Sequence, residues 1–357
     1  MKNISLINKI ILGIIFLSQI TFAQNDLQST LSNLSADAAK KYVEPISSSF
    51  GANLNSGWVH KAPSASLFGV DIEIGVVAMA TMFGNEQKNF SSTGKFRFND
   101  VQATALVDNA GITNPYARNF VINEIKKQDF GVNISGPTIV GSKKEFVEVE
   151  FQGATFTDNL TGQSFTVPSK QIATVASGFL DELPAAPLGA PQITIGTIYG
   201  TMASFRYLPS IEVDKDLGKF EYFGFGLQHN PSAWLPIPLP VDVSLAYFTQ
   251  SMKVGKIFDA SATSFGIYAS KRIGPGALNI TPYAGFAIES SEITIQYDYV
   301  VDYPVAGTVL PVKFNLKGEN SSRFVIGAAL KLAFLNLNVD YSFAKYKTIS
   351  GGLAFII

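Results

Sequence analysis

The chain contains 357 residues, of which 46% are hydrophobic and 12% aromatic, and its formal net charge is −1. Because Lys and Arg are scattered and no run of like charge occurs, we expect no nucleic-acid partner. Cysteine is absent from the sequence. This absence excludes disulfide bonds, thiolate metal sites and a cysteine nucleophile.

The N-terminus has the pattern of an export signal. Lys2 and Lys9 precede an apolar stretch at residues 10–20, and a small-residue cleavage site ends at Ala23. A membrane-anchoring helix needs about 20 apolar residues, and this stretch is much shorter. Residues 1–23 are therefore predicted to be a cleaved signal peptide, which takes the mature chain out of the cytoplasm.

Residues 24–46 are predicted to form a short N-terminal helix, because apolar residues recur at spacings of three and four between Leu27 and Ala38. Pro45 is predicted to end this helix. Two interpretations remain open. The helix docks on the periplasmic mouth of a barrel, or it enters the lumen as a plug.

Two strands are predicted next. Residues 50–58 alternate apolar side chains with Gly and Asn, and residues 68–76 alternate apolar side chains with Asp71, Glu73 and a glycine. A barrel would place Asp71 and Glu73 in its lumen, where two carboxylates on one wall would favour cations. Solvated lumen charges without such a role are the more ordinary explanation.

Residues 85–191 are more polar and are interrupted by Gly and Pro. Helices are predicted at residues 101–107 and 116–127, and strands at 147–151 and 164–167, the last preceded by a turn at 159–162. We interpret this stretch as a large insertion at the rim of a barrel. The alternative, a separate soluble domain, is disfavoured because the stretch has few apolar residues for a core of its own.

Regular alternation returns at residue 192 and continues through residue 357. Leu337 and Val339 lie on one face of a strand, for example, and Asn338 and Asp340 on the other. Strands are predicted at residues 192–208, 218–229, 240–253, 261–272, 277–299, 322–333, 336–346 and 348–357. Their connections are short on one side and longer on the other, which is typical of barrels with short periplasmic turns and long outer loops.

No stretch after the signal is apolar and long enough for a membrane helix, so in lipid the backbone can be satisfied only by a closed barrel. We predict an all-β fold, a transmembrane antiparallel β-barrel of about 12–14 strands. It occupies residues 47–357 and carries the short N-terminal helix and a mixed α/β rim insertion. A soluble secreted β-sandwich is the alternative fold.

Few patterns in the sequence point to catalysis. Neither His60 nor His229 has the spacing of a metal site or of a nucleophile motif. We expect no enzymatic activity, no cofactor and no metal, and a Ser–His dyad built around His229 is the alternative. The side chains expected to line the lumen are Asp71, Glu73, Arg206, Tyr222, Gln228, Asp242, Arg323 and Asp340.

Two glycines, Gly224 and Gly226, fall on the inward face of the strand at residues 218–229. Small inward residues leave room for a plug, a ligand or a close backbone approach, or they mark a bend in the wall. The following residues, 230–240, contain four prolines and cannot form a ladder strand. We expect a rim connection with Trp234 at the membrane interface.

The sequence around this connection resembles a known family. Residues 224–229, Trp234-Leu235-Pro236 and residues 239–244 are similar to an uncharacterised family of exported proteins of Gram-negative bacteria, which are expected to be outer-membrane barrels. The resemblance implies a fold and a compartment but no activity. The layout is more distantly similar to the long-chain fatty-acid transporter family, whose N-terminal Asn-Pro-Ala motif is missing here, so no binding residue is transferred.

Together these features predict a protein of the cell outer membrane. The leading hypothesis is a passive channel or transporter for small molecules, hydrophobic ones included. The alternative is a non-conducting structural or partner-binding barrel, and a soluble sandwich that binds a ligand is the third candidate. The expected partners are the lipid bilayer, the barrel-assembly machinery and, for a transporter, a small hydrophobic solute.

Overall fold

The computed structural model describes residues 36–65, 68–178, 180, 183–214, 218–235, 239–301 and 308–357. The predicted signal peptide and the first part of the predicted N-terminal helix lie outside the described residues. The described chain forms two compact units. Glu44–Gly84 and Leu183–Ile357 belong to the larger unit, and residues 36–43 and Asn85–Glu182 belong to the smaller one.

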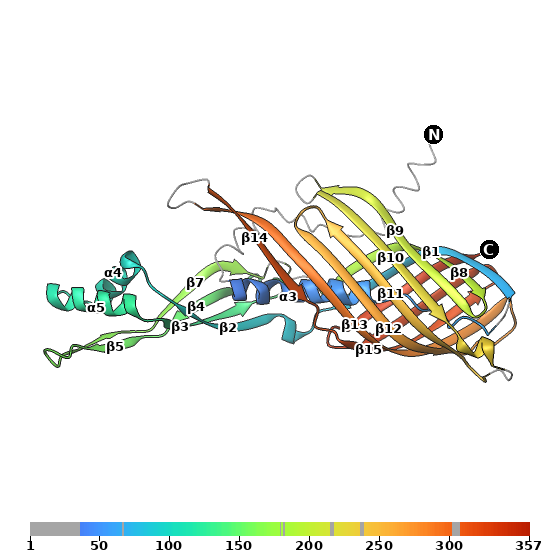
Figure 1. Ribbon diagram of the computed structural model, residues 1–357, viewed down its shortest axis with the longest axis horizontal. Helices are drawn as coiled ribbons and strands as arrows, with labels where there is room; N and C mark the ends of the chain where they lie inside the picture. Colours follow the sequence, from blue (N-terminus) through green and yellow to red (C-terminus); the bar gives the residue numbers. More distant parts are fainter. Residues whose placement is uncertain are drawn as a thin grey trace. The chain divides into compact units, whose positions relative to one another are not determined.

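The larger unit is a closed antiparallel barrel (Figure 1). Within the described residues ten strands form the ring, in which β1 pairs with both β8 and β17, and β12 with β13. These strands are β1 (Phe68–Met82), β8 (Ala185–Ile198), β9 (Thr201–Asp214), β10 (Gly218–His229), β11 (Asp242–Val254), β12 (Phe258–Ser270), β13 (Leu278–Val301), β15 (Ser322–Leu332), β16 (Leu335–Phe343) and β17 (Thr348–Ile356). A further strand, β14 (Thr308–Lys317), pairs with residues 292–301 of β13, and a short 3-10 helix, η2 (Pro231–Trp234), follows β10.

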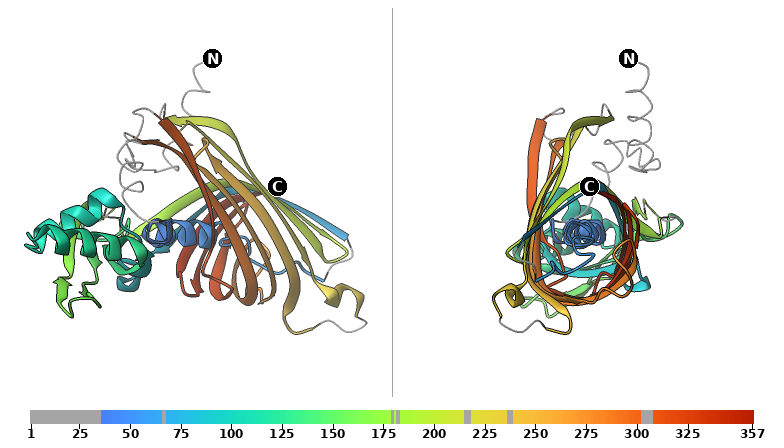
Figure 2. Two further views of the ribbon diagram at one scale, coloured as in Figure 1. Left: turned by 60° about the vertical axis from the view of Figure 1, so that its left-hand side comes forward. Right: turned by 90° about the vertical axis from the view of Figure 1, so that its right-hand side faces the viewer.

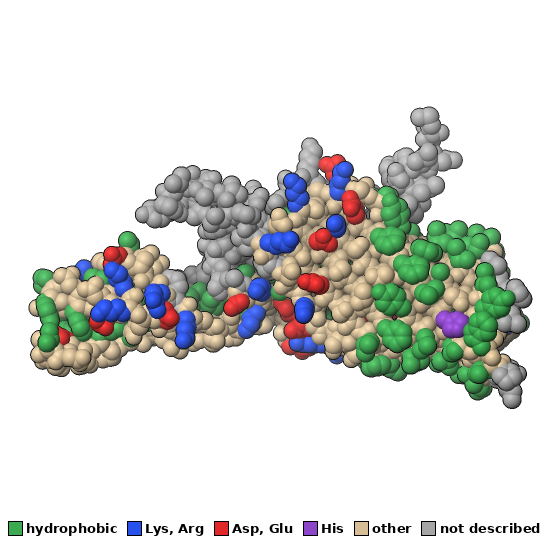
Figure 3. Space-filling view, viewed as in Figure 1, with side chains coloured by type: hydrophobic (Ala, Val, Ile, Leu, Met, Phe, Trp, Pro, Cys, Tyr) green, Lys and Arg blue, Asp and Glu red, His purple; other side chains and the backbone are tan. Residues whose placement is uncertain are grey.

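The outer face of the barrel carries an apolar belt. Side chains such as Phe265, Phe286 and Val339 are about half exposed on it, while their strand neighbours Ser264 and Asp340 are buried inside. Figure 3 shows hydrophobic side chains gathered over one part of the barrel wall and charged side chains over another. The alternation of the last strands therefore places their apolar faces outward, as predicted, and the single closed sheet is not a sandwich.

The number and bounds of the strands differ from the prediction. The ring has ten strands among the described residues rather than 12–14, because the strands of the insertion form sheets of their own. The predicted strand at 192–208 is two strands, divided by a tight turn at Tyr199 and Gly200. The stretch between the predicted strands at 277–299 and 322–333 contains β14, and β8 begins at Ala185, inside the stretch assigned to the insertion.

The first helix is longer than predicted. Helix α3 spans Ala36–Leu54 and contains Pro45, so the prediction that Pro45 ends it was wrong. The predicted strand at 50–58 was also wrong, because its first part is the end of α3. Ser47, Ser49 and Asn53 are buried together with Ala52 and Leu54, and a helix buried on all sides has no amphipathic period to reveal it. None of the described helices is long and apolar enough to cross a bilayer.

Among the described residues, the smaller unit has the start of α3, two complete α-helices and two small sheets. It comprises η1 (Asn85–Gln87), β2 (Asn89–Phe96), α4 (Asp100–Asn109), α5 (Pro115–Lys127), β3 (Phe130–Pro137), β4 (Phe146–Phe151), β5 (Ala154–Thr157), β6 (Ser164–Val167) and β7 (Lys170–Ser177). Helix α4 begins at a capping box formed by Asn99 and Gln102. Both predicted helices, the strand at 147–151 and the hairpin strand at 164–167 are confirmed.

This unit has a hydrophobic core of its own, which corrects the argument that its apolar residues are too few. Val107, Val121 and Ile125 from the two helices are fully buried and pack against Phe130 and Phe156 from the sheets. The sequence argument failed because the core draws one or two residues from each of many short elements. Phe98 joins them with its ring centroid 5.1 Å from that of Phe130.

The turn between β5 and β6 is organised around Asp158. Its carboxylate accepts hydrogen bonds from the Leu160 N–H at 2.9 Å, the Thr161 hydroxyl at 2.9 Å and the Tyr116 hydroxyl at 3.0 Å. These donors, led by the Leu160 N–H, hold the pKa of Asp158 below its ordinary value. Asp158 thereby ties the hairpin to the first turn of α5.

We expect the β5–β6 turn to loosen in acid. The native state binds fewer protons at Asp158 than the unfolded state, so its contribution is present above the ordinary Asp pKa and is lost as pH falls through the lowered native pKa. Amide exchange at Leu160 and Gly162, measured against pH, should report the loss. Asp158→Asn should flatten this profile and Asp129→Asn should not, and an unchanged profile in Asp158→Asn would contradict the assignment.

Arginine on the apolar belt should weaken the barrel strongly. Phe265→Arg is expected to cost about 2–4 kcal/mol, since the side chain lies within the belt of β12. Ser261→Arg lies on the same face of the same strand beyond the belt and should cost about 0–1 kcal/mol. Unfolding titrations of barrels folded into liposomes would measure both, and equal costs would show that the belt does not face lipid.

Candidate functional site: the chain segment inside the barrel

The barrel encloses part of its own chain, residues 44–63, which we call the lumen segment. Figure 2 shows helix α3 inside the ring of strands when the barrel is viewed along its axis. Glu44 accepts a hydrogen bond from the Tyr346 hydroxyl at 3.0 Å, and the Ser48 hydroxyl accepts one from the Glu319 N–H at 3.2 Å. Both partners lie in connections between strands, so the segment starts at one end of the barrel.

We call this end the loop end. Because the strands alternate in direction, it also holds the end of β1 and the start of β8, between which the smaller unit is inserted. The Met82 N–H donates to the Lys347 carbonyl at 2.9 Å and the Phe83 N–H to the Pro184 carbonyl at 3.0 Å, which places both connections beside the β16–β17 turn. The opposite end, with the connections at 199–200, 230–241, 271–277 and 333–334, is the turn end.

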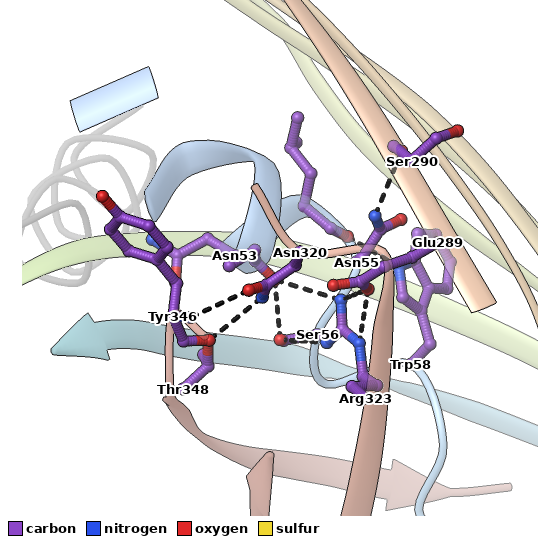
Figure 4. A network of polar contacts seen from close by, with 12 residues as sticks. Asn53, Asn55, Ser56, Trp58, Glu289, Ser290, Asn320, Arg323, Tyr346 and Thr348 are labelled. Atoms are coloured by element: carbon purple, nitrogen blue, oxygen red, sulfur yellow. Dashed lines mark hydrogen bonds and ion pairs between the residues drawn. The ribbon is translucent and has the colours of Figure 1, made fainter. Parts of the chain in front are cut away.

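Polar contacts hold the middle of the lumen segment (Figure 4). The Asn53 side chain donates to the Ala186 carbonyl at 2.8 Å and accepts from the Thr81 hydroxyl at 2.7 Å. The Gln250 side chain donates to Asn55 at 2.7 Å. These wall residues lie on β1, β8 and β11, so the segment is attached to several strands of the ring.

The segment then reaches the turn end. His60 and Lys61 contact the Glu73 carboxylate, with N–O distances of 2.9 and 2.5 Å. The Ala62 N–H donates to the Ser270 hydroxyl at 2.9 Å, and the Asn230 side chain to the Pro63 carbonyl at 2.7 Å. Ser270 ends β12 and Asn230 follows β10, so residues 44–63 pass through the barrel from one end to the other.

Two buried arginines of the wall bind the turn that follows α3, which ends at Leu54. Arg206 on β9 donates to the carbonyls of Ser56 and Gly57 at 3.0 and 2.5 Å. Arg323 on β15 donates to the Ser56 hydroxyl at 2.5 Å and forms an ion pair with Glu289 on β13. Arg323 also donates to the Ala52 carbonyl in the last turn of α3 at 3.5 Å, where the partial negative charge of the helix end favours a cation. We call Arg206 and Arg323 the arginine clamp.

Trp58 fills the barrel beside the clamp. Its ring is stacked on Phe248 with centroids 5.1 Å apart, and the Arg206 guanidinium lies 3.8 Å from the ring centroid. A Cβ on Gly224 would come within 2.8 Å of the Trp58 ring, and one on Gly226 within 3.2 Å. Of the explanations for the inward glycines, room for a plug is thus confirmed, and the plug is the lumen segment.

The structure places the predicted lumen residues as follows. Glu73, Arg206, Tyr222, Gln228, Arg323 and Asp340 are buried inside the barrel, Asp242 is half-buried and accepts from the Asn230 side chain, and Asp71 is exposed near Lys61. Glu73, Arg206, Arg323 and Asp340 bond to protein groups, Asp340 accepting from Tyr283 and Ser350. Both carboxylates of the predicted pair contact Lys61 of the lumen segment, but Glu73 is buried whereas Asp71 is exposed.

Sequence reasoning missed several residues of this site. Asn53, Ser56 and Trp58 were assigned to a strand, so their contacts with the wall were not expected. Glu289 was available from the pattern, because it follows the outward Ile288 of β13 and therefore faces inward. Its partner Arg323 was predicted.

The histidines have ordinary partners. His229 lies at the turn end with Nδ1 3.0 Å from the Thr201 hydroxyl, and the Trp234 indole N–H donates to its Nε2 at 3.1 Å. Trp234 is exposed and stacks on Tyr199, as an interface aromatic does. No group of three or more His, Asp or Glu able to hold a metal occurs among the described residues.

A closed antiparallel barrel with an apolar outer belt defines the class of outer-membrane β-barrels. Within it, the chain belongs to a family of unknown function, DUF6588, whose model matches residues 1–357. No curated protein matches the sequence. These findings agree with the resemblance to an uncharacterised family and give no support to the resemblance to fatty-acid transporters.

The chain is also similar to solved outer-membrane structures. A loop-deletion mutant of OmpT, an outer membrane protein of Vibrio cholerae, has 8% identity and a TM-score of 0.23, with 82% of this chain and 100% of that chain covered. Omp33 of Acinetobacter baumannii has 10% identity and a TM-score of 0.18 over 82% and 100%. The transport unit of the autotransporter AIDA-I from Escherichia coli has 11% identity and a TM-score of 0.23 over 87% and 98%.

Loss of the arginine clamp should loosen the lumen segment. Arg206→Met would leave the carbonyls of Ser56 and Gly57 without donors, at about 1–3 kcal/mol for each buried group left unpaired. Denaturant titration of the folded barrel, followed by its mobility on gels before and after boiling, would measure the change. Arg97→Met removes an exposed arginine of the smaller unit and should have little effect on the barrel. Equal effects of the two substitutions would contradict the role of Arg206.

Proposed function

We propose that this protein is an outer-membrane barrel closed by its own lumen segment, and that it anchors the unit formed by residues 85–182 in the membrane. It would thus be a non-conducting structural or partner-binding barrel without catalytic activity. The observation that carries the proposal is the passage of residues 44–63 through the whole barrel, with buried contacts at both ends and in the middle.

The size of the barrel supports this proposal. About eight strands leave an interior that side chains alone can fill. Ten strands are slightly wider, and α3 with Trp58 occupies the additional space. Ala52, Leu54 and Trp58 are all 2% exposed or less, so little room is left for water along the segment.

The leading hypothesis from the sequence, a passive channel, requires the lumen segment to move. Displacing it would separate Arg206 from two carbonyls and the Trp58 ring of the segment. It would also leave the Glu73 carboxylate without His60 and Lys61. Leaving a buried charge unpaired costs about 3–5 kcal/mol. The geometry therefore favours the closed barrel over an open pore.

The location is part of the same proposal. The predicted signal peptide at residues 1–23 would direct export, the barrel-assembly machinery would insert the chain, and the apolar belt would contact outer-membrane lipid. A small hydrophobic solute remains the expected partner only if the lumen segment can be displaced.

Conductance in planar bilayers tests the closure, and a disulfide makes the test specific. A Cβ on Gly51 would lie 2.8 Å from the Ser291 Cβ on β13, so Gly51→Cys with Ser291→Cys can form a disulfide after a shift of about 1 Å. The chain has no other cysteine, so a change of gel mobility under non-reducing conditions reports this bond alone. Gly51→Cys by itself is the matched control.

We expect no stable current steps from the native protein or from the oxidised double variant. Current steps that persist after oxidation would show that the lumen is open with the segment in place, and the proposal would fail. Steps that disappear on oxidation and return on reduction would replace the closed anchor with a gated channel. Arg206→Met with Arg323→Met should raise the frequency of openings, because both cations that hold the turn after α3 are lost.

A further inference from the structure

The direction of the lumen segment decides at which end of the barrel the residues just before it lie. Residue 44 lies at the loop end and residue 63 at the turn end. The chain that precedes Glu44 therefore enters the barrel at the loop end. The two connections to residues 85–182, at Met82 and Ala185, leave the barrel at the same end.

The outer surface indicates which end faces out of the cell. At the turn end, apolar side chains are exposed up to the last residues of the strands, with Leu278, Phe334 and Phe355 each more than half exposed. At the loop end, the strands continue past the belt with polar outer faces, as at Ser261 and Glu292. The membrane belt thus surrounds the part of the barrel next to the turn end (Figure 3).

The connections have the same asymmetry. The two largest connections, residues 83–184 and residues 302–321 with β14, lie at the loop end, beside three connections of three or four residues. The turn-end connections have two, two, seven and twelve residues. Short turns on the periplasmic side and longer segments outside are the rule for barrels of this class. Both arguments assign the loop end to the cell exterior.

We propose that residues 36–43, which precede the lumen segment, lie outside the cell together with residues 85–182. The described part of the smaller unit would then be exposed at the cell surface. This inference rests on the proposed closure of the barrel by residues 44–63, and it adds the sidedness of the two exposed parts.

Cysteine labelling in intact cells tests the proposal cleanly, since the natural chain has no cysteine. Three positions in the full-length protein serve as probes. Asp37→Cys reports the chain before the lumen segment, where the native side chain is 81% exposed. Leu160→Cys reports the smaller unit at a side chain that is 89% exposed. Gly276→Cys reports the turn end, where an added Cβ meets nothing within 4 Å.

The reagent is a maleimide attached to a polymer too large to pass outer-membrane porins, and labelling is read as a gel shift. Only protein that shifts in mobility on boiling is counted, which restricts the result to folded barrels. We expect residues 37 and 160 to be labelled as completely in intact cells as in detergent. Residue 276 should be labelled only after the outer membrane is permeabilised.

Each other pattern overturns the proposal in a recognisable way. Labelling at 160 without labelling at 37 would show that the N-terminal chain does not pass through the lumen, although the smaller unit is outside. Labelling at 276 alone would show that the barrel has the reverse orientation, with both parts in the periplasm. The closure of the lumen is judged separately, because the current measurements on the disulfide variant do not depend on orientation.

Discussion

The structure depends on supplying hydrogen-bond donors to the turn that follows α3, inside a barrel that has little room for water. A buried carbonyl left without a partner costs about 1–3 kcal/mol. Arg206 donates to the carbonyls of Ser56 and Gly57, and Arg323 donates to the Ser56 hydroxyl, from two different strands of the wall. The helix is thereby fixed in the ring, and the residues after it are directed toward the turn end.

The two arginines are neutralised in different ways. Arg323 forms an ion pair with Glu289, so its charge is balanced within the wall. The atoms around Arg206 are the Ser56 and Gly57 carbonyls, the Gln192 side-chain oxygen, the Tyr222 hydroxyl and the face of Trp58. Carbonyl oxygens and an aromatic face both attract cations. Most of the stabilisation of Arg206 thus comes from the lumen segment, whereas Arg323 keeps its carboxylate whether the segment is present or not.

Much of the barrel could be predicted from the sequence, because a strand between lipid and a polar interior must alternate. The strands from β10 to β13 and from β15 to β17 follow that rule. The turn at Tyr199 and Gly200 was missed because both residues have positive φ, a conformation that is uncommon for tyrosine. Asn-Gly or Gly-Gly would have been the usual signal for such a two-residue turn, and here the alternation continues through it.

The lumen segment could not be predicted, for a physical reason. Helix α3 is surrounded by protein over its second half, where Ser47, Ser49, Ala52 and Leu54 are all buried. An apolar/polar period arises only where the two faces of an element have different surroundings. A segment surrounded by protein on all sides has no such period. The eight lumen candidates followed from alternation, but what they contact depends on which part of the chain lies opposite them.

The passage of the chain through the ring has a consequence for the order of folding. Ser56 meets Arg323 across a sequence separation of 267 residues, so the clamp can form only after nearly the whole barrel has been delivered to the membrane. Until then the polar groups of the segment lack their partners in the barrel wall and are exposed to water. Its serines and asparagines, which are costly to bury, are well suited to that interval, because they keep the unpaired segment soluble and poorly disposed to aggregate. The polar composition of residues 44–63 thus favours solubility before the barrel closes and supplies hydrogen bonds to the wall after it has closed.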